Sequence, residues 1–172
     1  MLEALILVVF PFCMVYAAVS DMISMTIANR VSVLLVATFL IVAPLTGMPL
    51  EAVGMHALAG LIVLAVTFSL FALGTMGGGD AKLLAATALW MGLSVPLMQY
   101  IVVGAVWGGL LTLAILVYRR SPLSDVTGNF VLLQKFADHK AGVPYGVALG
   151  AAGLWVFPSS PLGLWAIAAL SR

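Results

Sequence analysis

Long apolar runs fill most of the chain, and short breaks rich in glycine, proline or charge separate them. The runs are continuous and lack the alternation of apolar and polar positions that marks a half-buried strand. They therefore predict helices and not the short alternating segments of a β-barrel. A helix needs about 20 apolar residues to cross the hydrocarbon core of a bilayer. The apolar runs cover residues 2–19, 27–42 (or 31–42), 52–73, 81–93, 96–118, 143–157 and 162–170.

Two of these regions leave the path of the chain open. The run at 81–93 is short for a full crossing, and a break at 158–161 interrupts the last apolar stretch. The two pieces on either side of that break could form one bent span, or a span followed by a surface helix. The first run begins with Glu3 and no basic residue, unlike a signal peptide, so we expect it to remain as a helix. The pattern predicts an all-α bundle of about six transmembrane helices in one integral membrane domain, residues 1–172.

The composition excludes several classes of protein. Hydrophobic residues make up 64% of the chain and charged residues only 8%, against about 25% charged residues in a typical soluble domain. A mean hydropathy of +1.23 leaves too little polar surface for a soluble enzyme or a nucleic-acid-binding module. The net charge of +1 indicates no acidic or basic partner. Because Cys13 is the only cysteine, an internal disulfide and a cysteine-based zinc site are excluded.

Lysine and arginine are distributed unevenly over the predicted loops. With six spans, six of the seven cationic residues fall in the first, third and fifth loops, and the second and fourth loops hold none. Positively charged loops stay on the cytoplasmic side of a membrane. We therefore expect these three loops in the cytoplasm and both chain termini outside. The cations in those loops are Arg30, Lys82, Arg119, Arg120, Lys135 and Lys140.

Two of the six carboxylates, Asp21 and Asp80, stand out by their position. Each lies where a long apolar run meets the predicted cytoplasmic face, and ionisable groups at membrane depth are costly enough to indicate function. A helix-capping role is the alternative, since Asp80 precedes a helical run as an N-cap would. However, three consecutive glycines, Gly77, Gly78 and Gly79, come before Asp80. A helix cap does not need three glycines. A run of glycines instead leaves a backbone that a bound peptide can approach closely.

A pair of neighbouring carboxylates would carry a specific chemistry. Two carboxyl groups that share a site do not both ionise easily, so the pair holds one proton. One carboxylate can then act as general base on water while the other polarises a scissile carbonyl, as in aspartic proteases. The predicted topology brings Asp21 and Asp80 to the same membrane face, although the sequence alone leaves their contact open.

Three motifs resemble those of one family, the type IV prepilin peptidases. Residues 77–84, Gly-Gly-Gly-Asp-Ala-Lys-Leu-Leu, resemble the family's Gly-x-Gly-Asp-x-Lys-Leu signature. Asp21, followed by Ile27 and Asn29, resembles its first catalytic aspartate and the trailing Ile-Pro-Asn element, with Ala28 in place of the proline. Pro144 and Tyr145, with the glycine after them, resemble the Pro-Tyr-Gly segment that opens the last span.

The resemblance implies a membrane aspartic endopeptidase that removes the leader peptide of type IV (Flp-like) prepilins at the cytoplasmic membrane face. It assigns catalysis to Asp21 and Asp80 and implies no metal or cofactor. The larger members carry an added domain with paired cysteines and methyltransferase activity, which this chain lacks, so the resemblance is to the short, peptidase-only branch of tight-adherence (Flp) pili. Residues implied in the active-site loop or in support of substrate and dyad are Gly77, Gly78, Gly79, Lys82, Asn29, Pro144 and Tyr145.

The same resemblance implies the partners and the location. The partners would be prepilin or pseudopilin precursors, membrane lipids and other pilus-assembly proteins, with no nucleic acid. The location would be the inner or cell membrane of a bacterium or archaeon, with several crossings and the active site facing the cytoplasm. Lys82 could hold a charge on the dyad or serve as a snorkelling membrane anchor.

Alternatives from other classes stay open. Asp21 and Asp80 could instead bind a proton or cation in a small transporter with broken helices, or the chain could be a non-catalytic subunit of pilus assembly. His56 and His139 are expected on opposite membrane faces, where they cannot share a metal ion. Glycines at four-residue intervals predict close helix packing in lipid. These glycines are Gly104, Gly108, Gly142, Gly146 and Gly150.

Overall fold

The computed structural model describes residues 1–122, 135–138 and 142–171, and in these residues the chain forms helices joined by short turns, with no strand. The all-helical prediction is confirmed. The helices in chain order are α1 (Leu2–Ser24), α2 (Asn29–Leu45), α3 (Leu50–Ala72), α4 (Gly78–Met91), α5 (Val95–Arg120), α8 (Tyr145–Val156), the 3₁₀ turn η1 (Phe157–Ser159) and α9 (Pro161–Leu170).

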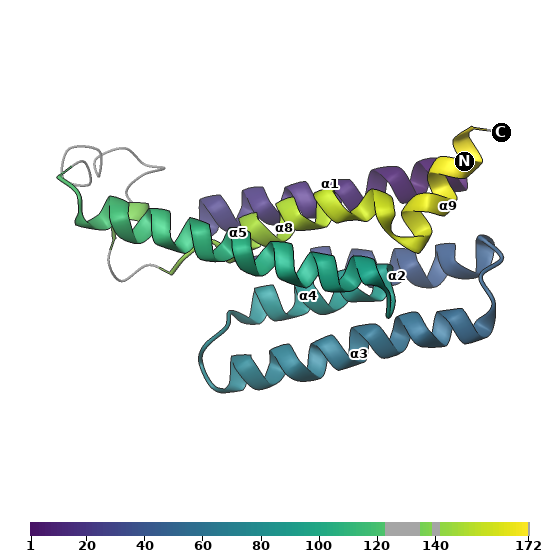
Figure 1. Ribbon diagram of the computed structural model, residues 1–172, viewed down its shortest axis with the longest axis horizontal. Helices are drawn as coiled ribbons and strands as arrows, with labels where there is room; N and C mark the ends of the chain where they lie inside the picture. The colour runs from purple at the N-terminus through teal and green to yellow at the C-terminus, as the bar shows by residue number, and fades with distance from the viewer. Residues whose placement is uncertain (123–134, 139–141, 172) are drawn as a thin grey trace.

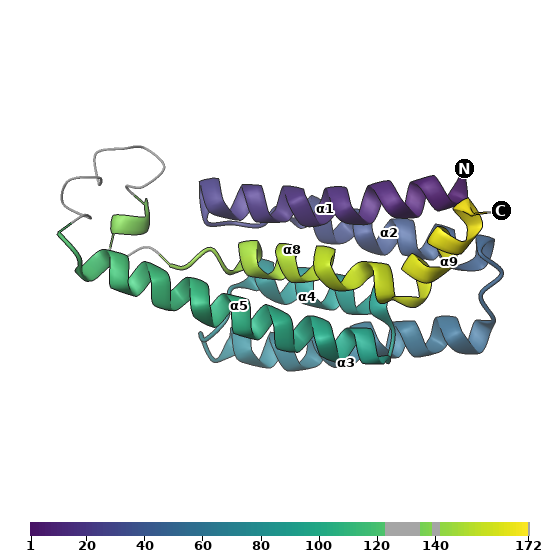
Figure 2. The same cartoon turned by 45° about the horizontal axis from the view of Figure 1, so that its top comes forward.

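The helices lie side by side along one long axis and alternate in direction (Figures 1 and 2). The C-terminal ends of α1, α3 and α5 and the N-terminal ends of α2, α4 and α8 gather at one end of the bundle. The N-terminus and the end of α9 lie at the opposite end. The segments that hold the two candidate aspartates therefore meet at one end, away from both chain termini.

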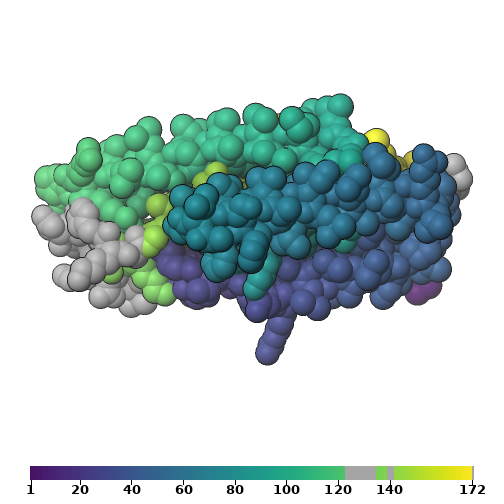
Figure 3. All heavy atoms as spheres, turned by 90° about the horizontal axis from the view of Figure 1, so that it is seen from below, coloured from purple at the N-terminus to yellow at the C-terminus, as the bar shows by residue number. Residues whose placement is uncertain are grey.

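The long helices carry the properties of membrane spans. Among the described residues, α1, α3 and α5 are long and apolar enough to cross a bilayer, and 28%, 28% and 22% of their most apolar windows are buried. The unburied remainder is an outward apolar surface, which lipid rather than water accommodates. Figure 3 shows one such face, with α3 uncovered across the front. The chain is thus a helical membrane protein.

The remaining helices are shorter than α1, α3 and α5. The helix α2 is apolar but has only 17 residues. The helices α8 and α9, with η1 between them, are bent by 57° at the break around Ser160, and together they would make a fourth span of sufficient length. Proline in the first turn of α9 and the hydroxyl of Ser160, which accepts from the Gly163 N–H, produce this break.

The short helix α4 occupies the middle of the bundle. Nine of its 14 residues are buried, because α3, α2 and α8 all pack against it. The indole N–H of Trp90 donates to the Leu35 carbonyl at 2.9 Å, and Phe10 packs against its ring with centroids 5.2 Å apart. Gly92, in the left-handed region at φ +67°, ends the helix. The short apolar run at 81–93 therefore corresponds to α4, a helix that other helices of the protein enclose.

Glycines allow α8 to sit against both α1 and α5. A Cβ at Gly150 would lie 2.6 Å from the carbonyl oxygen of Met14 on α1, so the two backbones nearly touch. On the α5 side, a Cβ at Gly108 would lie 2.1 Å from the ring of Tyr145. The predicted role of the glycines in close packing is confirmed at these positions. It is wrong for Gly142, which precedes the helix and has open space at its α-carbon.

Substitution of Gly150 by alanine should destabilise the bundle, because the new methyl group meets backbone that cannot rotate away. Overpacking of this kind costs about 1–3 kcal/mol, more than alanine gains in helix propensity. We expect a lower midpoint of thermal unfolding in detergent for Gly150→Ala. The matched control is Gly109→Ala on α5, where no atom lies within 4 Å of the added methyl group. A midpoint for Gly150→Ala equal to that of Gly109→Ala would contradict the packing described.

Candidate active site

Asp21 lies in the last turn of α1 and is almost fully buried, with 5% of its surface exposed. Its Oδ2 atom accepts a hydrogen bond of 2.7 Å from the backbone N–H of Gly146, at the start of α8. Its own carbonyl accepts from the N–H of Met25, whose left-handed conformation (φ 55°) ends α1. The carboxylate is thus held by a backbone donor 125 residues away in the chain.

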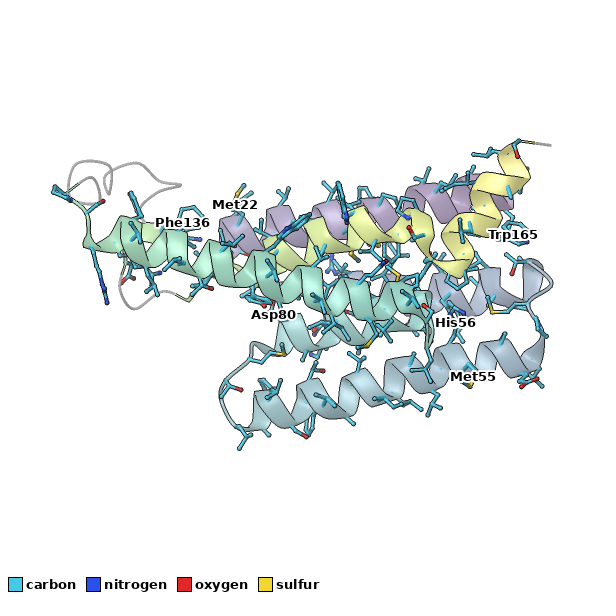
Figure 4. All side chains as sticks on the ribbon, in the orientation of Figure 1. Met22, Met55, His56, Asp80, Phe136 and Trp165 are labelled. Carbon is cyan, nitrogen blue, oxygen red and sulfur yellow. The ribbon has the colours of Figure 1, made fainter. Side chains whose placement is uncertain are left out.

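Asp80 lies in the first turn of α4 but does not cap it. The N-cap is Gly77, and the helix has no side-chain capping bond, so the alternative reading of Asp80 as an N-cap is wrong. Its carboxyl group instead turns back over Gly77, where an added Cβ would lie 2.8 Å from Oδ2. Figure 4 labels Asp80 at the end of the bundle where α4 begins.

The two aspartates act on each other electrostatically. Asp21 lies close enough to Asp80 for its negative charge to act on the second carboxyl group. The Oδ1 atom of Asp80 is buried and has no hydrogen-bond partner within the part of the chain that the structure describes. Buried polar atoms are almost always paired, so an orphaned carboxyl oxygen beside a second carboxylate is a reason to assign function.

Glycines and Ile27 bring three distant segments together around these carboxyl groups. A Cβ at Gly79 would lie 3.1 Å from Cβ of Ile27, and a Cβ at Gly146 would lie 2.7 Å from its Cδ1. The same Cβ at Gly146 would come within 2.9 Å of Asp21 Oδ2. Ile27 is 8% exposed and lies between the starts of α4 and α8. The absence of side chains at Gly79 and Gly146 therefore permits the approach of the segments that hold the two aspartates.

Lys82 and Asn29 contact each other. The Lys82 ammonium group donates to the Asn29 side-chain oxygen at 3.0 Å, and both residues are exposed. This bond joins the first residue of α2 to the first turns of α4. It places both residues at the same end of the bundle as the aspartates, where they connect α2, the helix that follows Asp21, to α4, the helix that contains Asp80.

Two tyrosines lie within the range of the Asp80 charge. Tyr145 packs its ring over Gly108. Tyr100, on α5, is fully buried beside Thr87. Its hydroxyl group has no hydrogen bond of ordinary geometry to the described residues. Sequence reasoning missed Tyr100, although a hydroxyl group within a long apolar run was a usable signal.

An apolar cleft of about 270 Å³ lies between the end of α1 that carries Asp21 and the helices α5 and α8. Met22 in its wall follows Asp21 directly, and Val147 follows Gly146, whose N–H binds Asp21. Figure 4 labels Met22 and Phe136 at this end of the bundle. The cleft is lined by Met22, Leu111, Ala114, Ile115, Tyr118, Phe136, Pro144 and Val147.

His56 lies apart from the aspartates, toward the other end of the bundle (Figure 4). It is buried, its Nδ1 atom forms a 2.8 Å hydrogen bond with the Leu89 carbonyl, and its ring stacks on Phe39. Within the described residues, no group of three histidine, cysteine, aspartate or glutamate side chains could hold a metal ion. His139, Lys140 and Asp125 lie outside the described residues.

The arrangement can perform hydrolysis. Two interacting carboxyl groups in an apolar environment can hold one proton between them and activate a water molecule. The apolar cleft offers a surface to a substrate, and Gly77, three residues before Asp80, is exposed.

Comparison with known proteins identifies the family. A model of the type IV leader peptidase family matches residues 8–120, more than half of the chain, and this region contains both aspartates. No curated protein and no solved structure matches the chain. The chain therefore belongs to the type IV leader peptidase family, which makes it a protease of the prepilin leader peptidase type.

Proposed function

We propose that this protease is an aspartic endopeptidase in which Asp21 and Asp80 cleave the leader peptide of type IV, Flp-like prepilins. The observation that carries the proposal is the buried Oδ1 atom of Asp80, which has no hydrogen-bond partner among the described residues and lies within reach of the Asp21 charge. A purely structural carboxylate at this depth would be expected to have its hydrogen bonds satisfied. The family match supports the class of substrate, since proteins of this family process prepilin leaders.

The dyad would use its single shared proton. The ionised carboxylate takes a proton from water as the water oxygen attacks the scissile carbonyl carbon. The protonated partner gives its proton to the carbonyl oxygen, which forms a neutral tetrahedral intermediate. The intermediate then returns its hydroxyl proton to one carboxylate and collapses. The leaving amine nitrogen takes a proton from the other carboxyl group, and the pair is left again with one proton.

The surroundings of the dyad fit a peptide that enters from the membrane. The apolar cleft near Asp21 would receive apolar side chains of the substrate, and the segment Gly77, Gly78 and Gly79, of which Gly77 is exposed, would lie along the extended peptide. Lys82, Asn29, Pro144 and Tyr145 would support the substrate or the dyad from the same end of the bundle. Other partners would be membrane lipids and further pilus-assembly proteins.

We further infer the orientation in the membrane. The Lys and Arg distribution favours about six crossings with both termini outside and the aspartates at the cytoplasmic face. The gathering of α1, α3 and α5 C-terminal ends opposite the chain termini supports this arrangement. The proposed location is the inner or cell membrane of a bacterium or archaeon.

Replacement of either aspartate by asparagine should abolish cleavage. Asparagine keeps the shape of the side chain but can neither take a proton from water nor share one, so the rate should fall about 10²–10⁴-fold. The measurement is the gel mobility of a co-expressed Flp-type prepilin in membranes that contain Asp21→Asn or Asp80→Asn.

Thermal unfolding in detergent should show that both variants fold. Full processing by either variant would exclude the dyad and favour a non-catalytic assembly subunit. Proton or cation flux in liposomes that depends on the same aspartates, without processing by the wild type, would favour a transporter.

Gly146→Ala should lower the cleavage rate. The added methyl group would meet Asp21 Oδ2 and Ile27, which forces the carboxylate away from its backbone donor. A displacement of about 1 Å at a reacting group lowers rates by about 10²-fold. The measurement is kcat for a purified prepilin in detergent, with Gly109→Ala as the control because its methyl group meets open space. A wild-type kcat for Gly146→Ala would show that the approach of α8 to Asp21 has no role in catalysis.

Filling of the apolar cleft should weaken substrate binding. Ala114→Phe adds an aromatic ring to the cleft wall, and we expect KM for the prepilin to rise by about tenfold or more. The control is Leu113→Phe, whose side chain is 58% exposed on the neighbouring face of α5. If both variants keep the wild-type KM, the substrate does not occupy this cleft.

A further inference from the structure

Arg119 forms a bridge between two parts of the segment that leads into α8. It lies in the last turn of α5 and is 8% exposed. Its Nε–H donates to the Phe136 carbonyl at 2.8 Å, and its Nη2 donates to the Gly142 carbonyl at 3.0 Å. A guanidinium group presents several donors in one rigid plane and can hold two carbonyls at once. The end of α5 is thereby connected to both sides of residues 137–141.

The Gly142 end of this bridge leads directly to Asp21. After Gly142 the chain passes through Val143, whose carbonyl accepts from the Tyr145 N–H at 2.8 Å. The next residue, Gly146, donates its N–H to Asp21 Oδ2. Only three residues separate the carbonyl that Arg119 holds from the N–H that holds the carboxylate. The position of that N–H therefore depends on where Arg119 fixes the chain.

The helix α5 holds the same segment at a second point. Gly108, 11 residues before Arg119, lies on the same face of α5, since 11 residues make about three helical turns. The ring of Tyr145 packs directly over Gly108. Arg119 and Gly108 thus fasten the chain on either side of Pro144, and the first turn of α8 is fixed against α5 before it reaches Asp21.

The Phe136 end of the bridge reaches α1. The residue before Phe136, Lys135, donates from its ammonium group to the Ile23 carbonyl in the last turn of α1. Cations at the C-terminal end of a helix are favoured by the carbonyls that lack partners there. Asp21 lies two residues before Ile23. The segments 135–138 and 142–146 therefore connect α5 to the end of α1 that carries Asp21.

From these contacts we propose that Arg119 is a positioning residue for the catalytic pair. By holding the carbonyls of Phe136 and Gly142, it fixes the N–H of Gly146 against Asp21 and so sets the direction of that carboxylate toward Asp80. The inference rests on the proposed function of the two aspartates. It gives this arginine a role beyond that of a positive charge at the membrane face.

The adjacent residue, Arg120, provides a matched control. It carries the same charge at the same end of α5, but its side chain is exposed. A general contribution of positive charge, to lipid contact or to topology, should be shared by both arginines. A contribution through the two carbonyls should be confined to Arg119.

The test compares Arg119→Ala and Arg120→Ala in steady-state cleavage of a purified prepilin in detergent. We expect Arg119→Ala to lower kcat about 10- to 100-fold, because the carboxylate is misdirected, and to raise KM by a smaller factor, because Phe136 and Pro144 line the cleft. Arg120→Ala should keep both constants. Added guanidinium ion should restore part of kcat to Arg119→Ala, whereas ammonium ion at equal ionic strength should not. Arg119→Lys, with one ammonium group for two carbonyls, should give an intermediate kcat.

Each other outcome is informative. A wild-type kcat for Arg119→Ala overturns the inference, as does a raised KM with unchanged kcat, which would indicate substrate contact instead. If Arg119→Ala does not fold, the comparison passes to Arg119→Lys and Arg119→Gln, and a wild-type kcat for both overturns the inference equally. Absence of cleavage by the wild type, or full cleavage by Asp21→Asn, would overturn the proposed function itself. These two outcomes do not depend on the Arg119 variants, so they are distinguishable from a failure of the inference about Arg119.

Discussion

The hydrogen bond from the Gly146 N–H to Asp21 is the constraint on which the rest of the site depends. A carboxylate placed at membrane depth is costly unless it finds a partner, and among the described residues Asp21 finds a backbone N–H in the first turn of α8. The bond requires the start of α8 to lie against the end of α1, which only a residue without a side chain permits. Gly150 and its contact with Met14 continue the same close approach one turn further along α8.

Unlike Asp21, Asp80 has a carboxyl oxygen whose need for a hydrogen bond is not met by the described residues. Its position in the first turn of the central helix α4 leaves this oxygen buried, near the charge of Asp21 and without a hydrogen-bond partner in the part of the chain that the structure describes. Further along α4, Trp90 packs against Phe10 of α1 in the buried core. The packing of the whole bundle therefore holds Asp80 in this position. Unsatisfied polar atoms of this kind persist where function requires them, and stability elsewhere compensates for them.

The apolar runs were enough to predict an all-helical membrane protein, and glycine spacing was enough to predict close packing of α8. The same runs did not reveal that the run at 81–93 belongs to an enclosed helix, Gly78–Met91, because hydropathy cannot distinguish burial in protein from burial in lipid. Asp21 and Asp80 were singled out as candidates because charge is rare in this chain. The contacts of Ile27 and Arg119 with the site could not be predicted, since they join residues far apart in sequence and arise only from tertiary packing.

The close contacts at glycine residues limit which parts of the site can change in sequence among such proteases. Around the two carboxyl groups, the walls contributed by Gly77, Gly79 and Gly146 are main chain, and a Cβ at any of them would meet a neighbouring atom within about 3 Å. Sequence change cannot reshape those walls without displacing the aspartates. Relatives that process different precursors would then have to differ along the α5 side of the cleft, where side chains such as Leu111 and Ala114 can vary freely. Chemistry and selectivity would evolve on separate helices.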